Sequence, residues 1–300
     1  MIVEKAINLD LTVQSGQTSQ PPWKQNNNIY SDVVLIDGNA SVFSVSQTGE
    51  FLDFDFTGDV LESEAILKLN HIFDLDFDLN KFYKYLSDHE ELKDMQEFCN
   101  GLRLFKAKDP FECIVSSICS ANNSIKRWTR SISDIKAKWG QNYMNHYTFP
   151  NISTLGEVFA DEDEELTVTG KLQGNNLKSC GVGYRSKYMR SACEFLGDDF
   201  DFSEISRMSY DEAFDTVLKI PGVGPKVADC ILLYGFDFKE AFPSDVWIKR
   251  IVSHLYFNGK DIKVSKVRDF GMDEFGEYAG YVQLYMFHYA RKSGLMSKLK

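Results

Sequence analysis

The strongest chemical pattern in the sequence is a glycine-rich segment that carries a lysine and is followed by an aspartate. Residues 220–230 read Ile-Pro-Gly-Val-Gly-Pro-Lys-Val-Ala-Asp-Cys, and Asp245 lies 19 residues after Lys226. Gly222 and Gly224 allow a tight turn between two helices, and the N–H groups that begin the second helix carry a partial positive charge. A phosphate would fit such a hairpin. A plain connector between helices, without a ligand, is the alternative interpretation.

Lys226 and Asp245 form a candidate catalytic pair. A neutral lysine can attack a sugar carbon while a carboxylate steers charge and protons. A lysine in the first turn of a helix faces the positive helix end, which predicts a slightly lowered pKa for Lys226. A helix of about 11 residues advances about 16 Å, and a loop of about nine residues spans up to about 30 Å, so the chain can bring Asp245 back to Lys226. A solvated surface lysine and an aspartate that only caps the next helix are the alternatives.

The composition is that of a globular protein with a large core. The chain has 300 residues, of which 43% are hydrophobic and 26% charged. It contains no run of about 18 uncharged apolar residues and no signal-like N-terminus, so we expect no membrane association and an intracellular location, cytoplasm and nucleoid or, in a eukaryote, the nucleus. The six cysteines show no CxxC pair or metal-ligand spacing, which predicts reduced thiols and no metal.

The net charge of −11 is unevenly distributed. Residues 1–100 hold six basic and 18 acidic residues, whereas the remaining 200 residues hold 27 basic and 26 acidic ones. Two stretches are basic, 101–140 with a net charge of +5 and 244–300 with +4. Both could contact phosphates, so the acidic total does not exclude a nucleic-acid partner.

The residue patterns predict two domains of an α+β protein that is mainly α. Alternation of Leu52, Phe54 and Phe56 with acidic residues predicts a strand with one wet face, and turn residues separate it from two earlier apolar runs. We therefore expect an N-terminal antiparallel β domain (1–79) packed on a helical domain (80–300). The expected strands are 33–36, 41–46 and 51–56.

Capping residues and apolar spacing predict the helices of the second domain. Asp109 followed by Pro110 predicts an N-cap, and Gly140 ends a later apolar pattern that starts at 125. Ser209 with Glu212 resembles a capping box and begins a helix-hairpin-helix at about 209–235. Further helical patterns cover about 225–235, 245–257 and 275–291.

The hairpin with its lysine and downstream aspartate resembles the helix-hairpin-helix (HhH-GPD) DNA glycosylases, and the details resemble their 8-oxoguanine DNA glycosylase/AP lyase branch. The resemblance extends from Ser15 to Arg291 and is densest between Gly101 and Phe287. It implies a bifunctional enzyme of base excision repair, a hydrolase and lyase that flips 8-oxoguanine out of duplex DNA and excises it. Lys226 would attack C1′, a Schiff base would form, and β-elimination would nick the strand, with Asp245 stabilising the positive charge.

The resemblance also implies residues that contact DNA. In the block Ser120-Ala121-Asn122-Asn123, Asn122 would fill the gap left by the flipped base, and Arg127 would contact the orphaned cytosine. Tyr184 would wedge into the stack, and Arg185 would again contact the cytosine. Trp247 stands where relatives often carry a phosphate-binding histidine. Singly, these residues also fit a helix kink or a surface aromatic. The expected DNA-binding residues are Asn122, Arg127, Tyr184, Arg185, Gly222, Gly224 and Trp247.

A second group of residues would form the base pocket. By resemblance, Gln283 would bond the Watson–Crick edge, Phe287 would stack on one face of the base, and Cys230 would cover the other. The carbonyl of Gly16 would accept from the protonated N7 of the lesion. The family continues Gly-Gln with Phe-Arg-Trp, whereas residues 18–23 here read Thr-Ser-Gln-Pro-Pro-Trp. As an alternative, Gln283 and Phe287, four residues apart, could be the edge of a core.

The resemblance implies a monomer whose partner is double-stranded DNA with oxidised guanine, and it implies no cofactor. The iron–sulfur cluster of the endonuclease III branch needs four C-terminal cysteines, and no cysteine follows Cys230. A glycosylase for alkylated bases is one alternative, but those relatives typically keep the aspartate and lack the lysine. A non-catalytic helix-hairpin-helix DNA-binding protein is another, although a pure binder needs neither Lys226 nor Asp245.

Overall fold

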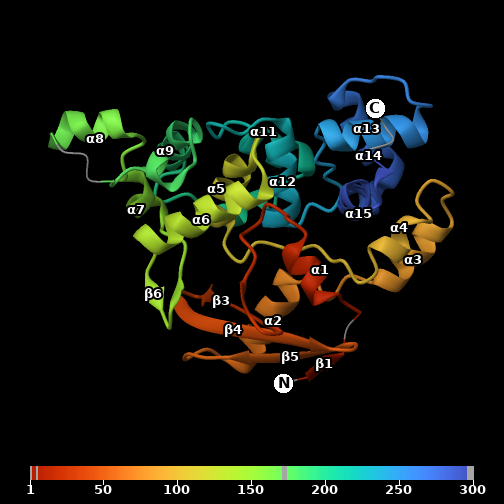
Figure 1. Ribbon diagram of the computed structural model, residues 1–300, viewed down its shortest axis with the longest axis horizontal. Helices are drawn as coiled ribbons and strands as arrows, with labels where there is room; N and C mark the ends of the chain where they lie inside the picture. Colours follow the sequence, from red (N-terminus) through yellow and green to blue (C-terminus); the bar gives the residue numbers. More distant parts are fainter. Residues whose placement is uncertain (1, 5, 171–173, 296–300) are drawn as a thin grey trace.

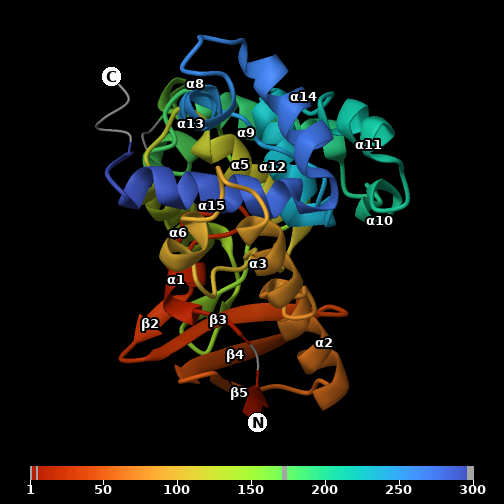
Figure 2. The same cartoon turned by 90° about the vertical axis from the view of Figure 1, so that its right-hand side faces the viewer.

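The computed structural model describes residues 2–4, 6–170 and 174–295, with a β-sheet at one end and a helical assembly on top of it (Figure 1, Figure 2). The sheet is antiparallel, with strand order β1-β5-β4-β3-β2. The fold class predicted from sequence, α+β and mainly α, is confirmed. The strands are β1 (Ile2–Glu4), β2 (Lys24–Asn26), β3 (Ile29–Ile36), β4 (Asn39–Thr48) and β5 (Phe51–Phe56), and a separate short hairpin consists of β6 (Asn142–Tyr143) and β7 (His146–Tyr147).

Strand β5 matches its predicted bounds and its predicted faces. Leu52 and Phe54 are buried, whereas Asp53 and Asp55 are exposed. Strands β3 and β4 are longer than predicted because their pairing continues from the apolar runs through polar residues to the turns. The sequence patterns did not predict β1 and β2, nor the helices of this region, α1 (Leu9–Gln14) and α2 (Glu62–Ile72).

Helices make up the rest of the molecule. The predicted caps are present, because the Asp109 side chain accepts from two N–H groups of α5 and Ser209 forms a capping box with Glu212. The remaining helices are α3 (Leu79–Ser87), α4 (Met95–Phe98), α5 (Pro110–Ser120), α6 (Ile125–Trp139), α7 (Ile152–Gly156), α8 (Glu162–Thr169), α9 (Arg185–Leu196), α10 (Phe202–Ile205), α11 (Tyr210–Val217), α12 (Pro225–Phe236), α13 (Val246–Tyr256), α14 (Val264–Phe275) and α15 (Ala279–Lys292), with 3₁₀ turns at Leu177–Cys180 and Gly276–Tyr278.

The predicted helix at 275–291 differs in its start. Helix α14 ends at Phe275, and Gly276 adopts a φ of +50°, so the chain turns before α15 begins at Ala279. Gly276 ends α14 here, as glycine does at many helix ends.

Two hydrophobic cores share α12. Val227, Ile231 and Leu232 pack into a cluster with α5, α6 and α9, whereas Leu233 and Tyr234 pack into a second cluster with α13 and α15. In Figure 1, α12 accordingly lies between the α5–α9 group and the α13–α15 group. The helix that begins with Pro225 and Lys226 is therefore fixed from two sides.

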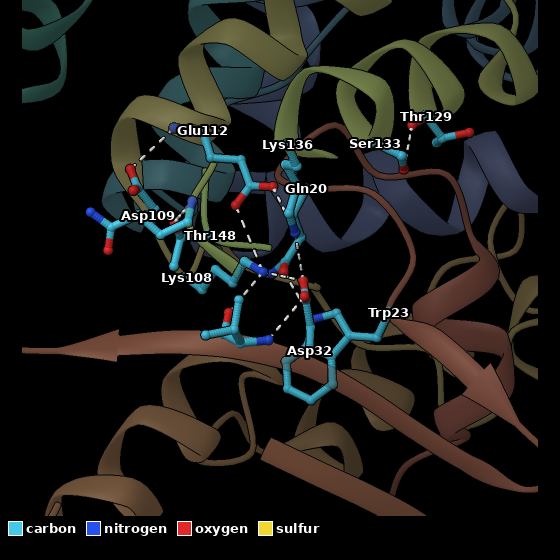
Figure 3. Close-up of polar contacts among 12 residues, drawn as sticks. Gln20, Trp23, Asp32, Lys108, Asp109, Glu112, Thr129, Ser133, Lys136 and Thr148 are labelled. Carbon is cyan, nitrogen blue, oxygen red and sulfur yellow. Dashed lines mark hydrogen bonds and ion pairs between the residues drawn. The ribbon is translucent and has the colours of Figure 1, made fainter. Parts of the chain in front are cut away.

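A buried ion-pair cluster joins the sheet to α5 and α6. Lys136 lies 2.9 Å from the Asp32 carboxylate of β3, and Lys108 also donates to Asp32 and, at 3.0 Å, to the Val33 carbonyl (Figure 3). Burial alone would raise the pKa of Asp32, but the two ammonium groups outweigh it and hold the pKa well below its usual range. Glu112, fully buried, lies 3.6 Å from Lys136.

The expectation that basic stretch 101–140 could contact phosphates is therefore wrong for half of its cations. Lys106 pairs with Asp74 at 2.9 Å, and the Arg103 guanidinium donates to backbone carbonyls. With Lys108 and Lys136, these four side chains neutralise internal acids and carbonyls, because buried charge requires partners. Only the cations on the outer face of α6 are left for an external partner.

Candidate active site

A small cavity brings the predicted catalytic pair together. It has a volume of about 50 Å³ and lies where the segment after α1 meets the starts of α12 and α13 and the middle of α15. Both Lys226 and Asp245 line it, as the loop-length estimate allowed. Its lining residues are Gly16, Gln17, Thr18, Lys226, Cys230, Tyr234, Asp245, Gln283, Leu284 and Phe287.

Asp245 is a helix cap and a cavity residue at once. Its Oδ1 accepts hydrogen bonds from the N–H groups of Trp247 at 2.8 Å and Ile248 at 2.9 Å. The two interpretations that the sequence left open are therefore compatible. The cap fixes the carboxylate at the start of α13 and leaves Oδ2 without a bond to the helix.

Lys226 lies one helical turn before Cys230, and the two side chains interact. Burial alone would lower the pKa of Lys226, but the nearby Cys230 and Asp245 outweigh this and raise the pKa above its usual value. The lowered pKa predicted from the helix position is therefore wrong. Burial raises the pKa of the Cys230 thiol in turn, even though Lys226 acts in the opposite direction.

Gly16 is held at the cavity by the segment that follows it. Its φ is +86°, and a Cβ at this position would collide with the side chain of Ile125 at the start of α6. The Gln17 side chain donates to the Arg103 carbonyl at 2.9 Å and accepts from the Phe105 N–H at 2.9 Å.

The atypical sequence after Gly16-Gln17 continues this attachment. Gln20 donates to the carbonyl of Lys106 at 2.7 Å and accepts from the indole of Trp23 at 2.9 Å. The Trp23 ring packs edge-on against Phe73 at 5.3 Å between centroids. Polar side chains, 86 residues distant in sequence from their backbone partners, thus anchor the loop that positions Gly16.

Gln283 and Phe287 line the cavity from one face of α15, with Gln283 buried and Phe287 half-buried. The Gln283 amide nitrogen donates to the Pro243 carbonyl at 3.0 Å. The amide oxygen of Gln283 takes no part in this bond. The Arg291 guanidinium lies 5.2 Å from the Phe287 ring centroid and donates to the Ser15 carbonyl at 3.0 Å. A cavity of about 50 Å³ holds a few waters, so a purine would have to displace these side chains.

Asn122 lies in the turn between α5 and α6, exposed and with a φ of +49°. The kink interpretation is thus correct for the backbone. Arg185, for which the resemblance implies a contact with cytosine, is buried beneath this turn. Its guanidinium donates to the carbonyls of Ala121, of Asn122 at 3.0 Å and of Val182 at 3.2 Å. Arg185 therefore joins the turn after α5 to the turn before α9.

The other predicted DNA-binding residues surround this region without forming part of the cavity. Tyr184 is 58% exposed, with its ring 4.5 Å from the Arg185 guanidinium. Gly222 has a φ of +86°, and a Cβ there would lie 2.6 Å from that of Tyr188, so glycine is required. A Cβ on Gly224 would meet open space. Trp247 is 44% exposed in the first turn of α13.

Arg127 lies exposed in the first turn of α6, which Ser124 caps. Sequence reasoning missed four cavity residues, namely Gln17, Thr18, Tyr234 and Leu284. Tyr234 follows Cys230 by four residues, so helical spacing could have found it. Among the described residues, no group of His, Cys, Asp or Glu side chains could hold a metal ion, and no helix is long and apolar enough to cross a membrane.

Comparison with known proteins agrees with this geometry. Residues 115–275 match the family model of HhH-GPD superfamily base excision DNA repair proteins. The chain belongs to this superfamily. Residues 1–114 match the model of the 8-oxoguanine DNA glycosylase N-terminal domain. The chain is also 43% identical to a probable N-glycosylase/DNA lyase of Methanothermobacter thermautotrophicus, over 97% of this chain and 96% of that protein.

Solved structures show the same architecture. The 8-oxoguanine glycosylase/lyase of Clostridium acetobutylicum, in complex with duplex DNA containing cytosine opposite 8-oxoguanine, superimposes with a TM-score of 0.80 at 29% identity, over 97% of this chain and 93% of that one. A 3-methyladenine DNA glycosylase of Archaeoglobus fulgidus superimposes with a TM-score of 0.77 over 98% and 99% of the chains. At 19% identity, the second likeness shows the fold alone.

Proposed function

We propose that this HhH-GPD protein is an N-glycosylase/DNA lyase that excises 8-oxoguanine from duplex DNA in base excision repair. The observation that carries the proposal is the meeting of Lys226 and Asp245 in one cavity, with Gly16, Gln283 and Phe287 in its walls. One chain supplies all of these groups, which supports a monomeric enzyme. Its place of action is the compartment that holds the DNA.

The chemistry begins at the Lys226 amine. After loss of a proton, Nζ forms a bond to C1′ of the deoxyribose, while the bond from C1′ to N9 breaks and its electron pair leaves with the base. The Asp245 carboxylate stabilises the positive charge that develops on the sugar. The C1′–O4′ bond of this adduct then breaks, with a proton taken up by O4′, to leave a Schiff base between Nζ and C1′. Loss of a C2′ proton from the Schiff base expels the 3′ phosphate by β-elimination, which cuts the strand.

The lesion is recognised in the same cavity once it has enlarged. The Gly16 carbonyl accepts from the N7–H that 8-oxoguanine has and guanine lacks, Gln283 bonds the Watson–Crick edge, and Phe287 and Cys230 cover the two faces. Because the anchored loop fixes Gly16, a base with an acceptor at N7 leaves this carbonyl unpaired, which costs about 1–3 kcal/mol.

Contacts made by Tyr184 and by the turn that contains Asn122 compensate for the free energy needed to flip the base out of the duplex. Tyr184 enters the stack, Asn122 occupies the vacated position, and Arg127 and Arg185 contact the orphaned cytosine. The hairpin residues Gly222 and Gly224, together with Trp247, contact the DNA backbone. For Arg185 this requires an exchange of its present carbonyl partners for the cytosine.

Borohydride trapping tests the proposal. Wild-type protein incubated with a duplex holding 8-oxoguanine opposite cytosine is expected to give a covalent complex, and Lys226→Gln is expected to give none. Lys219→Gln is the matched control, because this exposed lysine lies in the same hairpin but does not line the cavity. Loss of the complex in both variants, or in neither, contradicts the assignment of Lys226.

Asp245→Asn separates capping from charge. Asparagine caps helices about as well as aspartate, so we expect the fold to persist while base release slows by about 100-fold or more. If the wild-type protein excises alkylated bases and leaves 8-oxoguanine intact, the alternative, a glycosylase for alkylated bases, is favoured instead. Binding without any excision would favour a non-catalytic protein.

A further inference from the structure

The second basic stretch of the sequence contributes cations to the surface. Arg250, Lys260, Lys263 and Lys266 are all exposed, and none of these side chains forms an ion pair among the described residues. Lys298 and Lys300 of this stretch lie outside the described residues. Helix α13 and the loop after it thus carry unpaired positive charge.

Part of this charge surrounds a cavity separate from the active site. The cavity has a volume of about 250 Å³ and is formed by the second half of α13 and the loop that follows it. Three cations and one carboxylate line it, so its lining is net positive. Its residues are Lys249, Arg250, Ser253, His254, Gly259, Lys260 and Asp261.

A buried hydroxyl in this cavity has no partner. Ser253 is 7% exposed, and its Oγ makes no hydrogen bond among the described residues. A serine in a helix often bonds the carbonyl four residues earlier, and an unpaired buried hydroxyl is costly. An anion that accepts from Ser253 and from the neighbouring cations would remove this cost.

One carboxylate currently occupies the edge of the cavity. Asp261, 88% exposed, lies 2.5 Å from the Lys249 ammonium. An exposed pair of this kind contributes little stability, so an incoming phosphate can replace Asp261 beside Lys249.

We propose that this cavity binds a phosphate of the DNA backbone at a distance from the flipped nucleotide; the inference rests on the proposed function. Ser253 lies eight residues after Asp245 on α13, about 12 Å along the helix, a length that three to four base-pair steps cover. A duplex that runs from the active site along α13 would reach this cavity.

The test compares charge-matched variants. Arg250→Gln/Lys260→Gln removes two cations from the cavity, and Lys81→Gln/Lys84→Gln removes two exposed cations from α3. Each is measured in the Lys226→Gln background, so that the 8-oxoguanine duplex is bound but not consumed. We expect the first pair to weaken binding roughly tenfold and to reduce the salt slope by about 1, and the control pair to change neither. Equal affinity and slope in the two double variants would overturn the proposal.

Two single variants are expected to change the affinity for DNA in opposite directions. Ser253→Ala is expected to weaken DNA binding severalfold while the melting temperature stays the same or rises, because the unpaired hydroxyl is gone. Asp261→Asn is expected to strengthen binding, because it removes the competing carboxylate. A fall in melting temperature for Ser253→Ala without weaker binding would show a structural role and contradict the proposal.

A duplex-length series identifies the source of the phosphate. Duplexes extended one base pair at a time from the lesion are expected to gain affinity at about the third or fourth added pair, and this gain disappears in Arg250→Gln/Lys260→Gln. Inorganic phosphate that binds the cavity in calorimetry while DNA affinity is unaffected by the double variant would show a free-anion site and overturn the DNA proposal. Failure of the wild type to excise 8-oxoguanine would refute the proposed function, whereas binding of undamaged duplex would still test the cavity.

Discussion

The Nη2 group of Arg185 donates a hydrogen bond of 3.0 Å to the carbonyl oxygen of Asn122, the residue expected to fill the gap left by a flipped base. A side chain at the start of α9 thereby fixes the turn between α5 and α6. The wedge residue Tyr184 is its direct neighbour in sequence. The two segments predicted to enter the DNA stack are therefore mechanically connected before DNA arrives.

Arg185→Lys keeps the charge and loses the planar fork, so it is expected to destabilise the protein by about 1–3 kcal/mol. It should also slow excision opposite cytosine, because Asn122 loses its fixed conformation. Urea unfolding and single-turnover excision measure the two effects. Arg127→Lys is the control, since this exposed side chain should leave stability within about 0.5 kcal/mol. Wild-type stability in Arg185→Lys would contradict the role of the buried guanidinium.

The raised pKa of Lys226 predicts a pH-dependent reaction. Below its pKa, the neutral fraction of an amine rises tenfold per pH unit, so the rate of base release should rise with a logarithmic slope near 1 between about pH 7 and 9. Asp245→Asn should shift this limb to lower pH, because the carboxylate helps to raise the pKa. Single-turnover profiles of both proteins measure this, and a flat wild-type profile in that range would show that DNA binding lowers the lysine pKa.

The lowered pKa of Asp32 predicts that the free energy of unfolding decreases at acid pH. A carboxylate with a depressed folded-state pKa contributes stability that is present above its unfolded pKa of about 4 and is lost as pH falls below that value. Asp32→Asn should cost about 3 kcal/mol at neutral pH, since it leaves Lys108 and Lys136 without their main partner.

Unfolding free energies measured from pH 7 down to about pH 3 check this expectation, and the Asp32→Asn curve should be flatter than the wild-type curve. The matched control is Asp53→Asn, on the exposed face of β5. A cost at Asp53 equal to that at Asp32 would refute the importance of the buried cluster.

Gly16→Ala tests the close approach of the loop to α6. The φ of +86° and the collision with Ile125 should together destabilise the protein by about 1–3 kcal/mol and displace the carbonyl that reads N7. Excision of 8-oxoguanine should fall more than trapping at a preformed abasic site, which has no base to read. Gly49→Ala is the control, because Gly49 has a φ of +62° but open space around it. Equal selectivity in Gly16→Ala and wild type would exclude Gly16 from base recognition.

Apolar alternation and capping residues predicted those parts of the fold whose interactions lie within a few residues in the sequence. The alternation in β5 and the caps at Asp109 and Ser209 were readable because their partners lie within a few residues. Strand β2 was not, since all of its side chains are exposed and only backbone pairing with β3 defines it. The meeting of Lys226 and Asp245 was predicted from spacing and resemblance together.

Long-range partners explain what the sequence did not reveal. The hydrogen bonds of Gln17 and Gln20 to residues 103–106 join segments that are 86 residues apart. No sequence periodicity predicts such long-range hydrogen bonds. The cytosine contact of Arg185 was predicted from the family resemblance alone, and no local pattern indicated that carbonyls at the end of α5 bind its guanidinium in the interior. Internal carboxylates and carbonyls likewise keep half of the cations of the first basic stretch away from the surface.

The membership of α12 in both hydrophobic cores limits how the enzyme can move. A hinge movement between the two helical halves would separate α12 from one of its two hydrophobic clusters, either at Val227 and Ile231 or at Leu233 and Tyr234. The free-energy cost of the apolar surface exposed is about 25 cal/mol per Å². Closure of one helical half against the other is therefore disfavoured. The protein then adapts through side chains at the cavity and at the Asn122 turn, whereas the bending and opening of the helix are made by the duplex. The search for damage therefore depends on how readily each base pair deforms.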